Sequence, residues 1–204
     1  PESIFIATFT EKAAKELVTR ITNELANRNI TANINEMYIG TFHSLCLRML
    51  KEHLEYTRLR RNYRLMDSFD QQYMVFQNIH RFRSIPEIEI VLPNGGAWKQ
   101  AETICNFVNN LSEELVSPEE LMSDHDPSIA SLGRMLQEYR TILTEANLMD
   151  FSSIQIEAYR LLCDNEGILN ELRSAITHIM VDEYQDTNYI QEQLVFLLAG
   201  ERKN

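Results

Sequence analysis

The chain has 204 residues, of which 44% are hydrophobic and 24% are charged, and its formal net charge is −11. This composition supports a globular core, and the negative charge argues against a protein that coats nucleic acid non-specifically. The apolar runs fall far short of the roughly 20 residues that span a bilayer, so no membrane segment is expected. The three cysteines, Cys46, Cys105 and Cys163, are widely spaced; they fit neither a disulfide framework nor a metal knuckle, and reduced thiols in a cytoplasmic protein are expected.

Short apolar runs predict three strands, and the first two lead into helical patterns. The strands are expected at residues 3–8, 37–40 and 176–181. After the first strand, residues 11–27 place apolar side chains on one stripe, with Thr10 as a candidate N-cap, and residues 41–56 follow the second strand in the same way. Strand followed by helix, repeated, predicts a parallel α/β sheet with crossover helices.

The middle of the chain has helical spacing and no period-two runs. Helices are expected at residues 68–82, 99–111 and 130–147, and Ser117-Pro118 marks a further helix start. We therefore expect a chain that is predominantly helical, with a sheet domain formed by residues 1–67 and 146–204 and an all-helical insertion at 68–145.

The third strand runs into adjacent carboxylates, Asp182 and Glu183. This placement puts them at the carboxyl edge of a parallel sheet, where ligands of such folds bind. In nucleotide hydrolysis, the first acid would hold Mg²⁺ and the second would orient or deprotonate the attacking water. The alternative is that the pair only caps the following helix.

Two strand-to-helix turns carry hydroxyl and aromatic side chains. The first is TFTEKAA at residues 8–14, and the second is GTFHS at residues 40–44. A helix N-terminus with hydroxyl groups suits phosphate, and an exposed Phe9 would stack on a base. The plainer readings are that Thr10 is a cap, that Phe9 belongs to the core and that His43 is structural.

Charge is unevenly distributed along the chain. Residues 48–64 contain six Lys or Arg against two Glu, whereas residues 100–133 contain seven acids and no Lys or Arg. This polarity suits a protein that grips a polyanion on one face, and it equally suits solvated helix faces on an acidic protein.

The order of these motifs resembles the first RecA-like domain of superfamily 1 DNA helicases of the UvrD/Rep/PcrA type. The matching segments are TFTEKAA, GTFHS, LMDF at residues 148–151 and VDEYQDTN at residues 181–188. The resemblance covers nearly the whole chain, and the helical middle resembles the inserted subdomain called 1B. It implies a partial RecA-like P-loop NTPase sheet that belongs to an ATP-dependent DNA helicase or translocase of DNA repair or replication.

The resemblance also implies a role for each motif. Asp182 would ligate the Mg²⁺ of Mg-ATP, Glu183 would be the catalytic base, and Gln185 would link the nucleotide site to translocation. The residues expected to face single-stranded DNA are Phe9, Thr10, Lys12, Thr41 and His43.

The sequence departs from the family pattern in one respect that bears on activity. None of its five lysines is followed by Ser or Thr, so the phosphate-binding loop is expected to be missing. The resemblance places a further family motif, motif III, just beyond residues 197–200, and this motif and the second RecA-like domain are also expected to be missing. We therefore expect a helicase fragment that is inactive alone and whose free sheet edge favours a strand-swapped oligomer.

Two other readings stay open. In the first, the chain is a DNA- or protein-binding module without ATPase activity. In the second, it is part of a helicase that is fused to a nuclease. Retention of both Asp182 and Glu183 favours the enzyme over the binding module, because a pure binding module has no use for a metal-binding pair.

Overall fold

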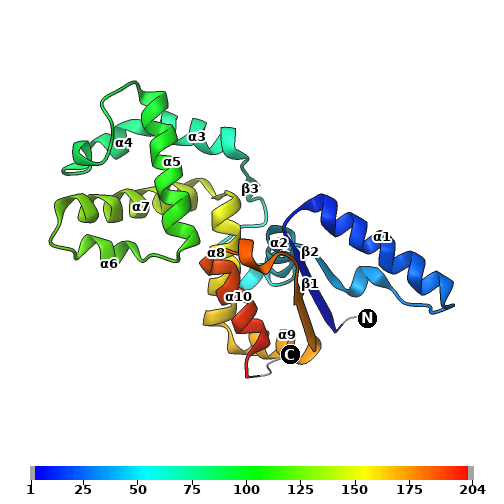
Figure 1. Ribbon diagram of the computed structural model, residues 1–204. Helices are drawn as coiled ribbons and strands as arrows, with labels where there is room; N and C mark the ends of the chain where they lie inside the picture. Colours follow the sequence, from blue (N-terminus) through cyan, green and yellow to red (C-terminus); the bar gives the residue numbers. More distant parts are fainter. Residues whose placement is uncertain (1–2, 202–204) are drawn as a thin grey trace. The chain divides into compact units, whose positions relative to one another are not determined.

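A computed structural model describes residues 3–201, apart from the side chain of Asn35, and is shown in Figure 1. The chain divides into two compact units. Unit 1 contains the residues up to Thr57 and those from Ile154 onward, and unit 2 contains Arg58–Ser153. The limits of unit 2 lie eight to ten residues outside the 68–145 insertion expected from the sequence. The reason is that residues 64–65 and 148–149, which flank the helices, pair with each other inside unit 2.

Unit 1 is built on a parallel sheet of three strands. They are β1 (Ile4–Thr8), β2 (Tyr38–Thr41) and β5 (His178–Val181), in the order β2-β1-β5. In the register, Phe5 lies opposite Tyr38 on one side and Ile179 on the other. The sequence prediction of a parallel sheet with helical crossovers is confirmed. In the described part of the chain β2 and β5 are the edges of this sheet, and self-association through a free edge stays a prediction.

The helices of unit 1 cover the sheet unevenly. They are α1 (Glu11–Asn27), α2 (Phe42–Glu52), α8 (Phe151–Asp164, which enters the unit at Ile154), α9 (Glu166–Ala175) and α10 (Tyr189–Ala199), with 3₁₀ turns at Ile34–Glu36, Leu54–Tyr56 and Tyr184–Asp186. Five side chains of α2 are buried, whereas Ala14 alone is buried in α1. The apolar stripe expected on α1 is therefore only partly buried.

Unit 2 is helical, with one short pair of parallel strands. Its elements are β3 (Arg64–Leu65), α3 (Ser68–Gln77), α4 (Ile79–Arg83), the 3₁₀ turn Ile88–Ile90, α5 (Ala97–Glu113), α6 (Pro118–Met122), α7 (Pro127–Ala146) and β4 (Leu148–Met149). The helices expected at 99–111 and 130–147 are confirmed, and Ser117 caps α6 as expected. The two-residue strands were not predicted, because so short a pair leaves no periodic signal.

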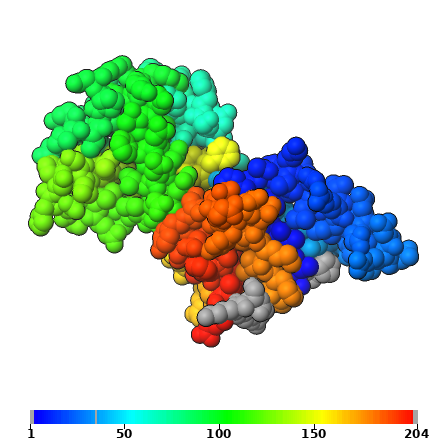
Figure 2. Space-filling view, viewed as in Figure 1, coloured from blue at the N-terminus to red at the C-terminus, as the bar shows by residue number. Residues whose placement is uncertain are grey.

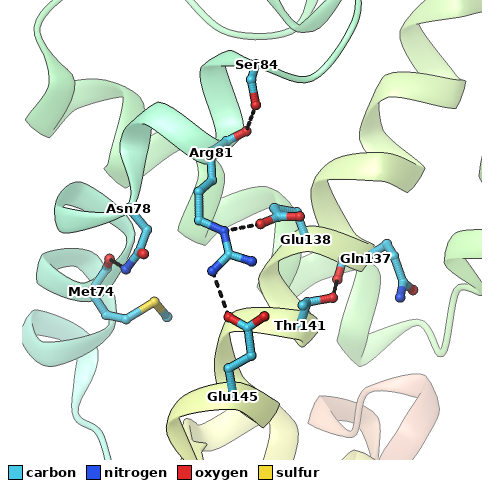
Figure 3. Close-up of polar contacts among 8 residues, drawn as sticks. All are labelled: Met74, Asn78, Arg81, Ser84, Gln137, Glu138, Thr141 and Glu145. Atoms are coloured by element: carbon cyan, nitrogen blue, oxygen red, sulfur yellow. Dashed lines mark hydrogen bonds and ion pairs between the residues drawn. The ribbon is translucent and has the colours of Figure 1, made fainter.

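The helix expected over residues 68–82 is broken at Asn78. The Asn78 side chain donates to the Met74 carbonyl at 2.9 Å (Figure 3). The backbone N–H of Asn78 is shared between the Met74 and Val75 carbonyls. Asparagine competes for backbone hydrogen bonds in this way and disfavours helix interiors. The chain therefore turns from α3 into α4 at this residue.

A buried polar network sits beside the apolar core of unit 2. Asp150 is 3% exposed and accepts hydrogen bonds from the Tyr139 hydroxyl, from Gln71 Nε2 at 3.1 Å and from the Ser153 amide at 2.7 Å. Gln71 Nε2 also donates to Asn109 Oδ1 at 2.8 Å. Buried polar groups are tolerated when they are satisfied in this way, so the network ties α3, α5 and α7 to the start of α8.

Arg81 joins α4 to α7 at the surface of unit 2. Its guanidinium forms ion pairs with Glu138 and, at 2.8 Å, with Glu145 (Figure 3). Both acids stand on α7, so this arginine has its charge compensated within the fold.

Among residues 3–201 no helix is long and apolar enough to cross a membrane.

Candidate functional site

The three polar motifs meet at one edge of the unit 1 sheet. Thr8, the last residue of β1, lies opposite Thr41, the last residue of β2. On the other side, the Asp182 amide donates to the Ala7 carbonyl at 2.9 Å and continues the ladder past the end of β5. The parallel strands therefore bring TFTEKAA, GTFHS and VDEYQDTN to one place, although they lie far apart in the sequence.

The first turn is held by its own hydroxyl groups and leaves an aromatic ring exposed. Thr10 caps α1 by accepting from the Ala13 amide at 3.1 Å, and the Thr8 hydroxyl donates to the Thr10 carbonyl at 3.2 Å. Phe9 is 53% exposed between them, so it does not belong to the core. Lys12, in the first turn of α1, is exposed as well.

The second turn is more enclosed. Thr41 is 8% exposed, and its hydroxyl accepts from the Ser44 amide and donates to Glu11 Oε1, both at 3.2 Å. This bond links α1 to α2. A side chain at Gly40 would place Cβ 2.3 Å from the Ser44 hydroxyl, so any larger residue would displace that hydroxyl.

His43 lies behind this turn and contacts α8. Its Nε2 is 3.0 Å from Nε2 of Gln155, which is buried. Burial lowers the pKa of His43 below its ordinary value, so the imidazole is neutral at neutral pH. With Gln155 donating, His43 Nε2 is the acceptor and the ring proton is on Nδ1.

The acidic loop is exposed and internally braced. Glu183 adopts a left-handed conformation with φ 51°, and its carboxylate accepts from Gln185 Nε2 at 2.6 Å. The Asp186 amide donates to the Glu183 carbonyl at 2.8 Å, and Asn188 caps α10 through a capping box with Gln191. Figure 2 shows this part of the chain in orange on the surface. A non-glycine residue with positive φ costs roughly 1 kcal/mol or more and often marks a functional loop.

Asp182 faces a pocket of about 420 Å³. The pocket lies between α1 and the ends of β1 and β5, and its lining includes Thr8, Leu17, Arg20 and Met180. Among residues 3–201 the Asp182 carboxylate has no hydrogen-bond or ion-pair partner, and it is exposed. Arg20 is engaged with Glu16. The loop therefore presents one unpaired carboxylate to a space large enough for a ligand.

A complete metal cage is not preformed here. Within the described chain no three His, Cys, Asp or Glu side chains gather in a way that would hold a metal ion. Mg²⁺ usually takes only one or two protein carboxylates and completes its octahedron with waters and substrate phosphates. Asp182 fits that kind of site and does not fit a closed structural one.

Two contacts of the site had no signal in the sequence. Glu11 is bound by Thr41, and Gln155 lies against His43 across 112 positions of the chain. Glu11 lies within the TFTEKAA turn. From the sequence alone, an acid after an N-cap indicates only a favourable interaction with the helix dipole. Gln155 lies in α8, at a position that no sequence motif singles out.

Parallel strands with capped helices and a free carboxylate at their carboxyl edge define the α/β class that binds ligands at that edge. Comparison with known proteins narrows the class. The chain belongs to the UvrD/REP helicase family: the model of the UvrD/REP helicase N-terminal domain matches residues 1–204.

Individual relatives agree with the family. The chain is 33% identical to DNA helicase II of Haemophilus influenzae over 97% of its length, and 30% identical to DNA helicase II of Escherichia coli over 98%. It is 32% identical to ATP-dependent DNA helicase SRS2 of Saccharomyces cerevisiae over 98% of its length. The chain spans 26% of each DNA helicase II and 17% of SRS2, so it corresponds to about a quarter or less of these relatives.

Proposed function

We propose that this chain supplies the metal-nucleotide carboxylates and part of the single-stranded DNA contact surface of an ATP-dependent DNA helicase. The observation that carries the proposal is the meeting of the unpaired Asp182 carboxylate with the exposed Phe9 at one sheet edge. The relatives named as DNA helicases support the same function.

The two acids of the loop take different roles in this proposal. Asp182 would hold the Mg²⁺ of bound ATP, and the metal ion would supply charge neutralisation at the phosphates. Glu183 would orient and deprotonate the attacking water. The Gln185 amide, 2.6 Å from the Glu183 carboxylate, would hold that carboxylate in position and pass changes at the nucleotide to the rest of the loop.

The two strand-to-helix turns would contact the DNA strand. Phe9 is exposed for stacking on a base, and Lys12 and Thr10, in the same turn, would reach phosphates. Thr41 and His43 are already engaged by Glu11 and Gln155, so their contribution would be to shape the second turn and to offer DNA the remaining polar atoms.

The 204 residues contain no Gly-Lys-Ser or Gly-Lys-Thr sequence. A phosphate-binding loop of that type cradles the phosphates of ATP in P-loop enzymes. We therefore propose that the 204-residue chain does not hydrolyse ATP by itself, and that the activity requires residues beyond it.

The test compares ATP hydrolysis by the 204-residue chain and by the full-length gene product, each with and without single-stranded DNA. The proposal expects a silent 204-residue chain and a DNA-stimulated full-length protein whose rate falls roughly 100-fold or more in Glu183→Gln. Glu192→Gln, at an acid on α10 that binds Tyr184, is the matched control and should retain the rate. A full-length protein that binds DNA but never hydrolyses ATP would contradict the proposal and favour a binding module.

A further inference from the structure

Unit 2 carries a cluster of exposed aromatic side chains that the proposed site does not use. We call it the aromatic patch, and it consists of Phe69, Tyr73 and Phe76 on α3 and Trp98 on α5. Positions 69, 73 and 76 fall on one face of α3, opposite the buried face that includes Met74 and Val75. Phe69 is 64% exposed and Trp98 is 41% exposed.

The rings of the aromatic patch hold one another in place. Phe69 and Tyr73 are parallel, with centroids 6.3 Å apart and an interplanar angle of 3°. Trp98 contacts Phe69 at 5.9 Å and Phe76 at 5.6 Å, and its carbonyl accepts from Gln72 Nε2 at 3.2 Å. These side chains form a preorganised apolar surface, and large exposed apolar surfaces mark binding sites.

Three of the four rings of the aromatic patch, those on α3, lie in the positively charged part of an otherwise acidic unit. Residues 58–83 contain six arginines and two aspartates, whereas residues 84–153 contain three Lys or Arg and twelve acids. A polyanion would therefore be attracted to the segment that carries α3 and repelled by most of the remainder.

Arginines flank the aromatic patch on two sides. Arg64 and Tyr73 line the same pocket, of about 600 Å³. On the other side, Arg83 Nε donates to Gln100 Oε1 at 2.9 Å, in the first turn of α5 that also carries Trp98. Gln100 is neutral, so the charge of Arg83 is not cancelled by this partner.

Most of the other charged side chains that line this pocket are paired with each other. Arg81 lines it too, but this arginine is paired with Glu138 and Glu145 (Figure 3). Asp70 also lines the pocket. The positive charge offered to a ligand therefore comes from Arg64, together with the exposed Arg60 and Arg61 that precede β3.

We infer that the aromatic patch is a second binding surface for single-stranded nucleic acid, on which bases stack while Arg64 and Arg83 neutralise phosphates. Aromatic faces with flanking cations accept any base, because every base has a π-face. The inference rests on the proposed function for its substrate, but it adds a surface that is separate from the sheet edge.

Trp98 is the only tryptophan of the chain, so its fluorescence reports on the patch directly. Any tryptophan elsewhere in the full-length protein would add its own emission, so the measurement uses the 204-residue chain. An oligothymidylate of about 20 nucleotides should quench Trp98 as bases stack on it. An abasic oligonucleotide of equal length and charge should bind more weakly and leave the emission nearly unchanged.

Substitutions separate stacking from simple attraction. Phe69→Ala with Tyr73→Ala should weaken oligothymidylate binding about tenfold or more, measured by anisotropy of a labelled strand. Tyr73→Phe keeps the ring and should retain the affinity. Phe196→Ala removes an aromatic side chain of similar exposure outside the patch and is the matched control. Arg64→Ala should lower the slope of log affinity against log salt by about one.

The outcomes distinguish this inference from the proposed function. If the strand binds and Phe9→Ala weakens it, while Trp98 emission and the double variant do not respond, the inference is overturned and the proposed function stands. If no strand binds to the chain or to the full-length protein, both are overturned. If Trp98 emission changes with protein concentration and not with the strand, the aromatic patch binds a second copy and the inference is wrong.

Discussion

Two aspartates of this chain each follow a short strand directly, but one is buried and the other is exposed. Asp150 comes directly after β4, in unit 2, and is buried with hydrogen bonds from Tyr139, Gln71 and Ser153. Asp182 comes directly after β5, in unit 1, and is exposed beside a pocket without a partner in the described chain. The first carboxylate is used to hold helices together, and the second is left available.

The difference arises from what surrounds each strand end. In unit 2, Gln71 of α3, Tyr139 of α7 and the Ser153 amide of α8 donate to Asp150, so its charge is satisfied inside the fold. In unit 1 the end of β5 lies beside a pocket that α1 lines, and α1 itself buries little. Satisfied buried acids stabilise a fold, whereas an acid left exposed at a sheet edge costs little and can serve a ligand.

The largest effect that separates the two units is on stability. Asp150→Ala should lower the free energy of unfolding by about 3 kcal/mol or more, because it removes the acceptor of the buried Tyr139 hydroxyl and of the buried Ser153 amide. Asp182→Ala should change it by less than about 0.5 kcal/mol. Urea unfolding followed by far-UV circular dichroism, which reports the helices of both units, measures both, and equal effects of the two substitutions would contradict the contrast.

The next effect appears at high pH. Burial and the charge of Asp150 raise the pKa of Cys105 from 9.0 to about 12, and burial also raises the pKa of Tyr139. Because the raised pKa in the folded state favours the neutral thiol, stability is fully present below pH ~9 and is lost as the pH rises towards ~12.

Cys105→Ala should therefore flatten the fall in stability between pH ~9 and ~10, where the unfolded thiol ionises first and contributes up to about 1.4 kcal/mol per pH unit. Cys163→Ala, at an exposed cysteine, is the matched control. A pH profile that Cys105→Ala leaves unchanged would show that this thiol does not carry the dependence.

A further comparison of the two units makes the same substitution at two glycines. A Cβ at Gly133 of α7 would lie 2.7 Å from the Met122 amide nitrogen and 2.8 Å from the Pro118 carbonyl, whereas a Cβ at Gly167 of α9 meets nothing within 4 Å. Gly133→Ala should destabilise by about 1–3 kcal/mol through overpacking of α6 on α7. Gly167→Ala should stabilise by about 0.5 kcal/mol. Thermal unfolding of both variants checks the sign, and stabilisation by Gly133→Ala would refute the close packing of these helices.

Much of unit 1 was predictable because its signals are local. Strand periodicity at 3–8 and 37–40, the cap at Thr10 and the extent of α1 all appear in the structure as the sequence indicates. The gathering of three motifs at one edge followed from parallel pairing alone. The roles of Asp182, Glu183, Gln185 and the DNA-facing residues stay predictions.

The rest depended on contacts that no local pattern encodes. The break at Asn78 results from one side chain binding the Met74 carbonyl. The pairing of β3 with β4 joins segments more than eighty residues apart and moves the limits of unit 2 outward. The exposure of the aromatic patch could not be predicted either, because an aromatic residue at helical spacing is ordinarily part of a core.

The most direct test of the contrast between Asp150 and Asp182 measures both the ATP hydrolysis and the stability of one variant. In the full-length protein, Asp182→Asn should lower DNA-stimulated ATP hydrolysis roughly 100-fold, while the unfolding free energy of the 204-residue chain stays within about 0.5 kcal/mol of the original. An unchanged hydrolysis rate would show that the exposed carboxylate does not serve the nucleotide, and it would contradict the account.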